Sequence, residues 1–239
     1  MSTHDTLYDD WVGGDLRPKR IEDMALRPEL KDILMMYEET GVFGHILMMG
    51  DVGTGKTTAA HILGKSDKFN IVEYNCAHEN SREVLKKIEK QTSSITLFGG
   101  IRIIVMDEFH HTTKENQTIL NKVMEERKKN NRFIFCVNDL SKVAVPIKSR
   151  CAKLSFDVGF VSDVDNAFHL RSYIDDMTIE EWKVELRRIG NNISKLAGIE
   201  APDEIMEKVL SNPLYIKDAR SFLIALQLKC KTHQWKNNR

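Results

Sequence analysis

The sequence has few of the features that mark secreted or membrane-spanning proteins. Only 4 of its 239 residues are cysteines, and they are scattered without the short Cys/His spacing of a zinc site. We therefore expect reduced thiols, and neither a disulfide framework nor a structural zinc. No apolar run is long enough to cross a bilayer. The polar, acidic start MSTHDTLYDD lacks the apolar segment of a secretory signal. These absences predict a cytoplasmic protein.

An excess of charge of either sign is also absent. The chain has 35 basic and 35 acidic side chains and a pI of about 7.1. We therefore do not expect a protein that binds nucleic acid through its overall charge. A local basic face could still bind nucleic acid. His110 and His111 form the only adjacent histidine pair. Neighbours in sequence rarely converge on one metal ion, so we assign them none.

Apolar, β-rich runs alternate with longer amphipathic stretches over the first two thirds of the chain. This alternation predicts a parallel sheet with helices on both faces. After residue 156 only amphipathic helices are indicated, so we expect an α/β domain over 1–156 and a small all-helical lid domain over 157–239. The expected strands are 45–49, 71–74, 101–106, 133–137 and 154–156. The expected helices are 57–64, 81–91, 114–128, 179–196, 203–210 and 218–230.

A glycine-rich segment follows the first expected strand. Residues 50–57 read GDVGTGKT and fit the pattern G-x-x-x-x-G-K-[ST], between a strand and a helix as that motif requires. Glycines let the backbone wrap closely around an anion, so that successive N–H groups and the helix N-terminus face phosphates. The motif thus predicts a P-loop that binds ATP with Mg²⁺. The residues expected to contact nucleotide here are Gly50, Gly53, Thr54, Gly55, Lys56, Thr57 and Thr58.

Two adjacent carboxylates end the third expected strand. Charged groups are costly to bury unless they are paired or bound to cations, and Asp107 and Glu108 follow an apolar run. In a P-loop protein, Asp107 can hold Mg²⁺ together with the Thr57 hydroxyl, while Glu108 can polarise an attacking water. Considered without the phosphate loop, the two carboxylates could be an ordinary polar end of a strand. Together with the phosphate loop, the pair predicts hydrolysis, whereas a kinase would need a second substrate pocket.

These motifs, with three further segments, resemble an AAA+ ATPase of the clamp-loader branch. FCVND at 135–139 ends a strand with Asn, VPIKSRC at 145–151 contains a Ser-Arg-Cys motif, and KDAR at 217–220 is similar to the start of the sensor 2 helix. LRPKRIED at 16–23 is similar to the opening of that family. The pattern is typical of replication factor C small subunits and of clamp-loader ATPases of T-even-type phages. If the protein is viral, it would act in the cytoplasm of the host cell.

The resemblance implies roles for individual residues. Asn138 would orient the lytic water, and Arg150 would act in trans as an arginine finger at a neighbour's γ-phosphate. Arg220 would contact the γ-phosphate in cis, Gln117 would link its helix to a neighbouring subunit, and Asn75 would restrain Glu108. Residues implied to line the adenine pocket are Gly13, Gly14, Asp15, Leu16 and Ala25. The family's aromatic residue before Arg-Pro is replaced by Leu16.

The resemblance also implies a function. The chain would be an ATP-driven subunit of a hetero- and homo-oligomeric ring that opens a sliding clamp and places it on primer–template DNA, with ATP hydrolysis releasing it. DNA contacts would be mainly to phosphates; Lys86, Lys87, Lys90 and Lys122 are the candidates. Family members continue into a helical collar, for which we expect no room here. Two alternatives stay open: another AAA+ DNA-processing motor, such as a helicase loader or junction motor, and a nucleotide-binding scaffold without turnover.

Overall fold

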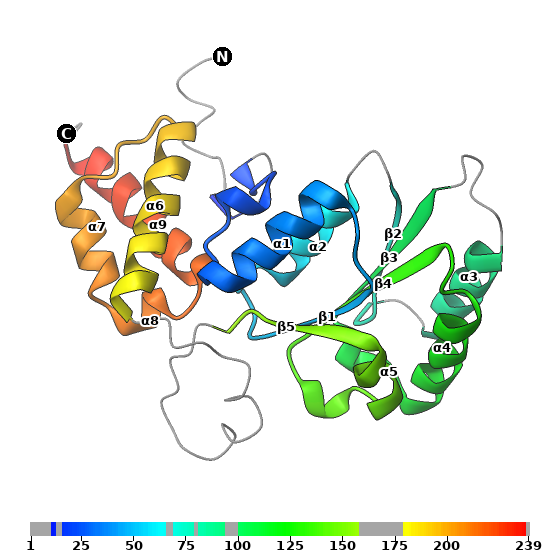
Figure 1. Cartoon of the computed structure of the whole chain (residues 1–239). Helices are drawn as coiled ribbons and strands as arrows, with labels where there is room; N and C mark the ends of the chain where they lie inside the picture. Colours follow the sequence, from blue (N-terminus) through cyan, green and yellow to red (C-terminus); the bar gives the residue numbers. More distant parts are fainter. Residues whose placement is uncertain are drawn as a thin grey trace. The chain divides into compact units, whose positions relative to one another are not determined.

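The computed structural model describes residues 11–12, 16–65, 69–78, 81–93, 100–157 and 179–237. These residues belong to two compact units. The first, called the helical unit, contains residues 1–28, 52–55 and 157–239; the second, called the α/β unit, contains residues 29–51 and 56–156. Both can be followed along the coloured ribbon of Figure 1. No helix among the described residues is long and apolar enough to span a membrane.

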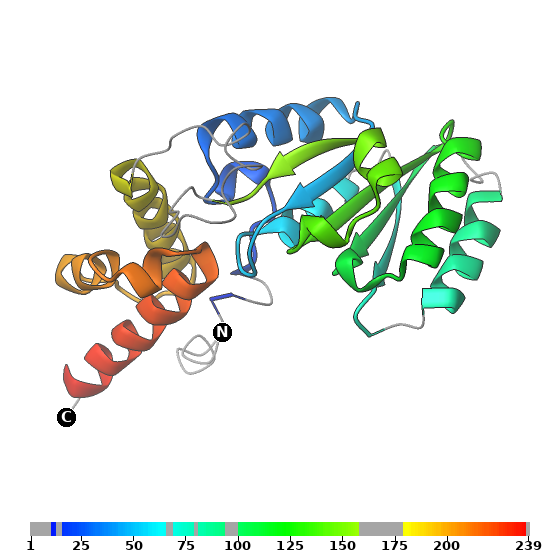
Figure 2. The ribbon, with the colours of Figure 1, turned by 90° about the horizontal axis from the view of Figure 1, so that it is seen from below.

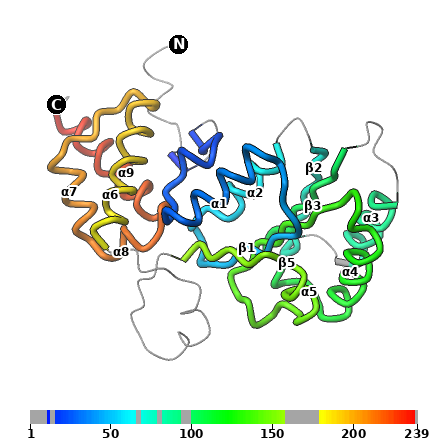
Figure 3. Tube along the Cα trace, in the orientation of Figure 1, coloured from blue at the N-terminus to red at the C-terminus, as the bar shows by residue number. Residues whose placement is uncertain are grey.

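A five-stranded parallel sheet forms the centre of the α/β unit. Its strand order is β2-β3-β4-β1-β5, and the trace in Figure 3 shows β1 beside β5. In the register, Met49 of β1 pairs with Val137 of β4, and Asn75 of β2 pairs with Asp107 of β3. The carboxyl ends of these parallel strands therefore share one edge of the sheet, where ligands bind in open α/β folds. The strands are β1 (His45–Met49), β2 (Phe69–Asn75), β3 (Ile101–Asp107), β4 (Asn131–Val137) and β5 (Cys151–Ser155).

Helices cover both faces of this sheet. On one face, strand residues such as Leu47 and Phe135 pack with buried residues of α3, α4 and α5 in one apolar cluster. On the other face α2 contacts β2, β3 and β4, and a Cβ on Gly64 would lie 2.2 Å from Ile71 of β2. Figure 2 shows the unit from below. The helices of this unit are α1 (Pro28–Thr40), α2 (Lys56–Gly64), α3 (Ser81–Ser93), η4 (Phe109–His111), α4 (Lys114–Glu126), η5 (Leu140–Lys142) and α5 (Val145–Arg150).

The central strands β1, β3 and β4 are mostly apolar because they are buried on both faces. In β3, the five residues from 102 to 106 are all buried, and Ile103, Ile104 and Val105 are fully so. Parallel strands between helical layers have this composition. The α4 helix instead buries one side, with Leu120, Val123 and Met124 inward, and Thr113 caps its start by accepting from the Asn116 N–H.

The helical unit has a core of its own. Apolar residues of α6, α7 and α9 pack together with Trp11 and Ala25 from the N-terminal segment. A Cβ on Gly190 of α6 would lie 2.9 Å from Leu226 of α9, so glycine lets the two helices pack closely without displacing that side chain. The Trp182 indole N–H donates to the Ile216 carbonyl at 2.7 Å, which satisfies its polar atom inside the core. The elements are η3 (Ile21–Asp23), α6 (Ile179–Leu196), α7 (Asp203–Leu210), α8 (Pro213–Ile216) and α9 (Ala219–Asn237).

The parallel sheet and the helical C-terminal region agree with the sequence-based prediction, and several boundaries differ from it. The strand predicted over 154–156 spans Cys151–Ser155 instead. The last helix was expected to end at residue 230, yet α9 continues to Asn237. The short helices α5 and α8 were not predicted, because each begins around a proline that reads as a break. Proline is tolerated in a first helical turn, where its missing N–H has no intrahelical partner.

Candidate functional site

The phosphate loop begins where β1 ends. Gly50, Gly53 and Gly55 have φ values of 147°, 90° and 101°, which side-chain-bearing residues rarely adopt. The Gly50 N–H donates to the Val137 carbonyl of β4 at 3.2 Å. The buried Lys56 ammonium donates to the carbonyls of Gly50 at 2.6 Å and Asp51 at 2.7 Å. The glycine backbone conformations and the hydrogen bonds of Lys56 together hold the phosphate loop in its curved form.

Gly53 lies directly against the start of α9 within the helical unit. A Cβ on Gly53 would be 2.4 Å from Asp218 Oδ1 and 3.1 Å from Arg220 Cβ. The buried Asp218 carboxylate caps α9 by accepting from the Ser221 N–H at 2.8 Å and its hydroxyl at 2.7 Å. The helix start that carries Arg220 is therefore fixed next to this glycine, and a contact of Arg220 with a bound phosphate stays a prediction.

The Asp107 carboxylate is held on both of its oxygens. Oδ2 accepts from the Thr57 hydroxyl at 3.0 Å, and Oδ1 accepts from the Glu108 N–H at 3.0 Å. A hydroxyl and a carboxylate are the hard oxygen ligands that Mg²⁺ prefers. Because Thr57 opens the helix that follows the phosphate loop, these two residues fit a magnesium ion bound beside nucleotide phosphates.

Glu108 has an unusual backbone conformation. Its φ of 52° and ψ of 36° place it in the left-handed region, alone among the non-glycine residues that the structure describes. Such a conformation costs about 1–2 kcal/mol and persists only where surrounding contacts over-determine it. One contact is a hydrogen bond from Asn138 Nδ2 to Glu108 Oε2 at 3.3 Å. Another is His110, whose Nε2 lies 3.3 Å from the same oxygen.

The Ser-Arg-Cys motif joins α5 to β5. Cys151, the first residue of β5, is buried, and burial raises the pKa of its thiol to about 12 although Arg150 and Lys153 oppose this. Arg150 is on the exposed side, where it donates to the Pro146 carbonyl at 2.8 Å and forms an ion pair with Glu125 of α4. The cysteine anchors the motif in the core and leaves the guanidinium at the surface.

Comparisons with known proteins agree with this geometry. Residues 46–157 match the model of the ATPase family associated with various cellular activities (AAA). The chain carries an AAA+ ATPase domain. Replication factor C small subunit of Halobacterium salinarum is 33% identical over 171 residues, which are 69% of this chain and 52% of that protein. The Picrophilus torridus small subunit is 33% identical over 147 residues, 59% of this chain and 46% of that protein.

The chain thus spans about half the length of the curated relatives it matches. Among solved structures, the RuvB Holliday junction branch migration motor of Thermotoga maritima aligns with a TM-score of 0.64 and 20% identity over 88% of this chain and 64% of that one. At this identity the match supports the AAA+ P-loop fold alone. The AAA+ domain is therefore similar in sequence to replication factor C small subunits, while a phage-type likeness stays a prediction.

Within the AAA+ domain, Gln117 does not have the role that the resemblance implied. Its side chain is completely buried. Nε2 donates to the carbonyls of Thr112 and Lys142, both at 2.9 Å, and Oε1 accepts from the Ala144 N–H at 2.7 Å. A direct link to a neighbouring subunit is wrong, because Gln117 instead joins the start of α4 to the segment that leads into α5.

Asn75 also differs from the expectation. Its Oδ1 accepts from the Ala77 N–H at 3.0 Å, whereas the residues that contact the Glu108 carboxylate are Asn138 and His110. The sequence analysis missed His110, although its position two residues after Glu108 was a usable signal. Ligand atoms of Glu108, His110 and His111 lie within 4.8 Å of one another, and the expectation that the histidine pair binds no metal ion stays a prediction.

The implied adenine pocket is only partly described. Gly13, Gly14 and Asp15 lie outside the described residues. Ala25 is buried in the apolar core of the helical unit, and Leu16 packs against that core. The adenine contacts stay a prediction.

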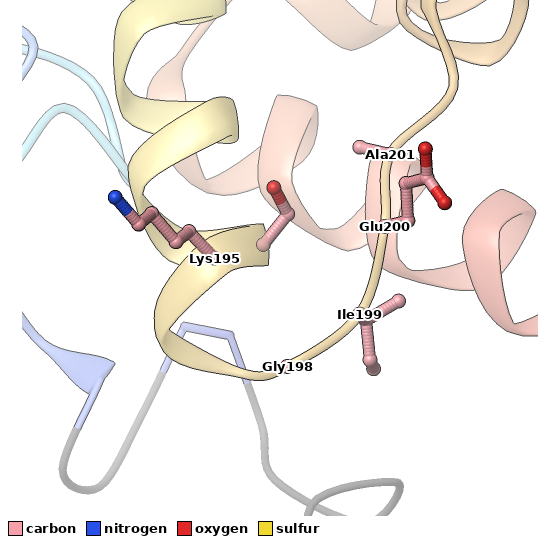
Figure 4. A pocket seen from close by; sticks show the side chains of 6 residues that line it. Lys195, Gly198, Ile199, Glu200 and Ala201 are labelled. Atoms are coloured by element: carbon pink, nitrogen blue, oxygen red, sulfur yellow. The ribbon is translucent and has the colours of Figure 1, made fainter.

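One hollow of the helical unit lies at the end of α6 and lacks the features of a catalytic site. It is an open pocket of about 320 Å³, among residues including Lys195 and Glu200. Figure 4 shows these two side chains pointing away from each other. Binding sites place polar groups so that they converge on a ligand. This pocket therefore adds nothing to the candidate site of the AAA+ domain.

Proposed function

We propose that this chain is an ATPase subunit of a sliding-clamp loader. The observation that carries the proposal is the convergence of the phosphate loop, the acid pair and Asn138 at the carboxyl ends of β1, β3 and β4. Thr57, Asp107, Glu108 and Asn138 are connected there through successive hydrogen bonds. The similarity to replication factor C small subunits supports the choice of clamp loading among AAA+ functions.

ATP would bind with its phosphates in the glycine loop. The loop amides and the N-terminus of α2 favour anions, and the Lys56 ammonium supplies positive charge within the same loop. Thr57 and Asp107 would hold Mg²⁺, which when bound neutralises charge on the phosphate oxygens. The peptide N–H of Glu108 and the Thr57 hydroxyl keep the Asp107 carboxylate oriented for that task.

Hydrolysis would use Glu108 as the group that polarises water. The water oxygen attacks the γ-phosphorus, the bond to the ADP oxygen breaks, and a proton of the water passes toward the carboxylate. Asn138 would orient the water, since its side-chain amide already contacts Glu108. Proper alignment contributes much of the rate in such displacements.

Two arginines would sense the γ-phosphate. We propose that Arg150 acts in trans at a neighbour's site, where a guanidinium stabilises charge on the transferring group. Its partly exposed position in its own domain supports a trans role. Arg220, carried by the proposed lid of residues 157–239 and fixed beside Gly53, would act in cis and couple nucleotide state to lid position.

In the assembled ring, ATP binding would favour the form that opens the clamp around primer–template DNA, and hydrolysis would release it. Contacts to DNA would be to phosphates and independent of sequence. Lys86, Lys87 and Lys90 are exposed on α3 and would supply such contacts. Lys122 of α4 lies 3.8 Å from Glu126, so part of its charge is already compensated.

A direct test combines Glu108→Gln with Lys56→Ala. Glu108→Gln should bind ATP normally and lose at least about 100-fold in turnover, because the amide is a poor proton acceptor. Lys56→Ala should lose ATP affinity. Normal turnover by Glu108→Gln would remove that residue from the mechanism.

The cellular role needs a second measurement. ATP hydrolysis by the wild-type protein with its partner subunits is compared with and without sliding clamp and primed DNA. Stimulation by both together supports a clamp loader. Stimulation by branched DNA alone would favour a junction motor, and background turnover under every condition would favour a scaffold subunit.

A further inference from the structure

His110 lies between the two residues proposed to prepare the water. Its side chain is only 9% exposed, and its Nε2 atom lies 3.3 Å from Glu108 Oε2. On the other side of the ring, Nδ1 accepts from the Asn138 backbone N–H at 3.4 Å. One imidazole therefore contacts both the end of β3 and the end of β4.

These contacts define the protonation of the ring. A nitrogen that accepts a hydrogen bond carries no proton, so a neutral His110 must carry its proton on Nε2. That N–H faces the Glu108 carboxylate.

Neighbouring groups also favour the neutral ring. Burial is the largest effect and lowers the pKa of His110 below its ordinary value of 6.5. Electrostatic effects of His111 and Lys142 act in the same direction, while those of Glu108 and Asp139 oppose it. At neutral pH the ring can thus donate to Glu108 without bringing a positive charge that would weaken it as a base.

We propose that His110 is a positioning residue for ATP hydrolysis, which fixes the Glu108 carboxylate through Nε2–H and ties it to the β4 end through Nδ1. The proposal rests on the proposed function, because it assumes that Glu108 polarises the water. His110 and Asn138 both contact Oε2, which leaves Oε1 to receive the proton of the water. Glu108 needs such support, since its backbone is held in the left-handed region.

Two substitutions separate the contacts of the ring. The side-chain oxygen of asparagine can take the place of Nδ1 but has no donor near the position of Nε2, whereas the amide nitrogen of glutamine reaches that position. His110→Asn should therefore lower kcat by about 10- to 100-fold, the range expected for a misplaced catalytic group, with KM for ATP unchanged. His110→Gln should keep kcat within about threefold of the wild type.

The control is His111→Asn, the same chemical change at the exposed neighbouring position, which should leave kcat within about twofold of the wild type. Binding of a fluorescent ATP analogue and the urea midpoint are measured for every variant, so that a loss of folding is recognised. Equal loss of kcat in His110→Asn and His110→Gln, with both folded, would overturn the inference, because a donor at the position of Nε2 would then not restore activity.

Glu108→Gln in the same assay distinguishes a failure of the proposed role of Glu108 from a failure of the proposed role of His110. If Glu108→Gln is inactive and His110→Asn retains full kcat, the role of His110 is wrong and that of Glu108 stands. If Glu108→Gln retains full turnover, the proposed function of the acid pair is wrong and the inference falls with it. A loss in His110→Asn that His110→Gln restores supports the inference.

Discussion

Arg150 is paired with Glu125 of its own chain. The two residues come from α5 and α4, 25 positions apart, and their side chains are 35% and 49% exposed. Ion pairs this exposed contribute about 0–1 kcal/mol to stability. The pair can therefore open at little cost if Arg150 is to reach a neighbouring subunit.

Arg150→Ala should leave ATP affinity intact and strongly reduce hydrolysis in the assembled complex, by about 10³-fold or more if it acts as an arginine finger. Turnover and nucleotide binding are measured on the same preparation. Glu125→Ala breaks the same ion pair without removing the guanidinium and should retain hydrolysis. Arg187→Ala removes a comparable pair with Glu207 in the helical unit and is the second control. Loss of ATP binding by isolated Arg150→Ala would contradict a trans role.

Gln117 should be important for stability. Gln117→Leu removes three hydrogen bonds and leaves the Ala144 N–H and two carbonyls without their partner. We expect the free energy of unfolding to fall by about 2–4 kcal/mol, since each unsatisfied buried group costs about 1–3 kcal/mol. Urea denaturation measures the change. Thr118→Ala, at the next and exposed position of α4, should change it by less than about 0.5 kcal/mol. An equally small effect of Gln117→Leu would contradict the importance of this junction.

Gly53 should tolerate no side chain. Gly53→Ala combines a φ of 90° with a Cβ only 2.4 Å from Asp218 Oδ1, an approach that real Cβ atoms do not make. The loop or the start of α9 must shift, so we expect ATP affinity to fall by at least about tenfold, measured by titration with a fluorescent analogue. Gly44→Ala introduces a methyl group with no atom within 4 Å. This control should bind ATP like the wild type, and Gly53→Ala doing so as well would contradict the prediction.

His45 should make stability depend on pH. Burial, and secondarily Arg132, lowers its pKa from 6.5 to about 4 in the folded protein. Between these values the unfolded chain binds more protons, so the free energy of unfolding is highest above pH 6.5 and falls as pH decreases toward 4. The loss is at most about 3 kcal/mol, from 1.36 kcal/mol per unit of pKa.

His45→Asn tests this dependence, because its side-chain oxygen can still accept the Phe133 N–H that Nδ1 accepts at 3.1 Å. Urea midpoints at pH 7.5, 5.5 and 4.5 should fall less steeply for this variant than for the wild type. His78→Asn, at an exposed position, should leave the slope unchanged. Identical slopes for the wild type and His45→Asn would rule out His45 as the source.

Much of the fold could be predicted from local sequence. The strand over His45–Met49 and the helices Ile179–Leu196 and Asp203–Leu210 have the predicted boundaries. Their signals are strong, because a fully apolar run and a one-sided apolar stripe have few alternative structures. Helices α5 and α8 were missed, because a proline near a helix start gives the same local signal as a proline in a loop.

The sequence by itself determined that this chain has a phosphate loop, an acid pair and a Ser-Arg-Cys motif, because each requires particular residue types at neighbouring positions. Only the tertiary structure decided that Gln117 is buried, that Arg150 pairs with Glu125, and that His110 contacts both Glu108 and Asn138. Those contacts join residues of different strands and helices. Their geometry depends on how the elements pack, and residue spacing along one chain does not specify it.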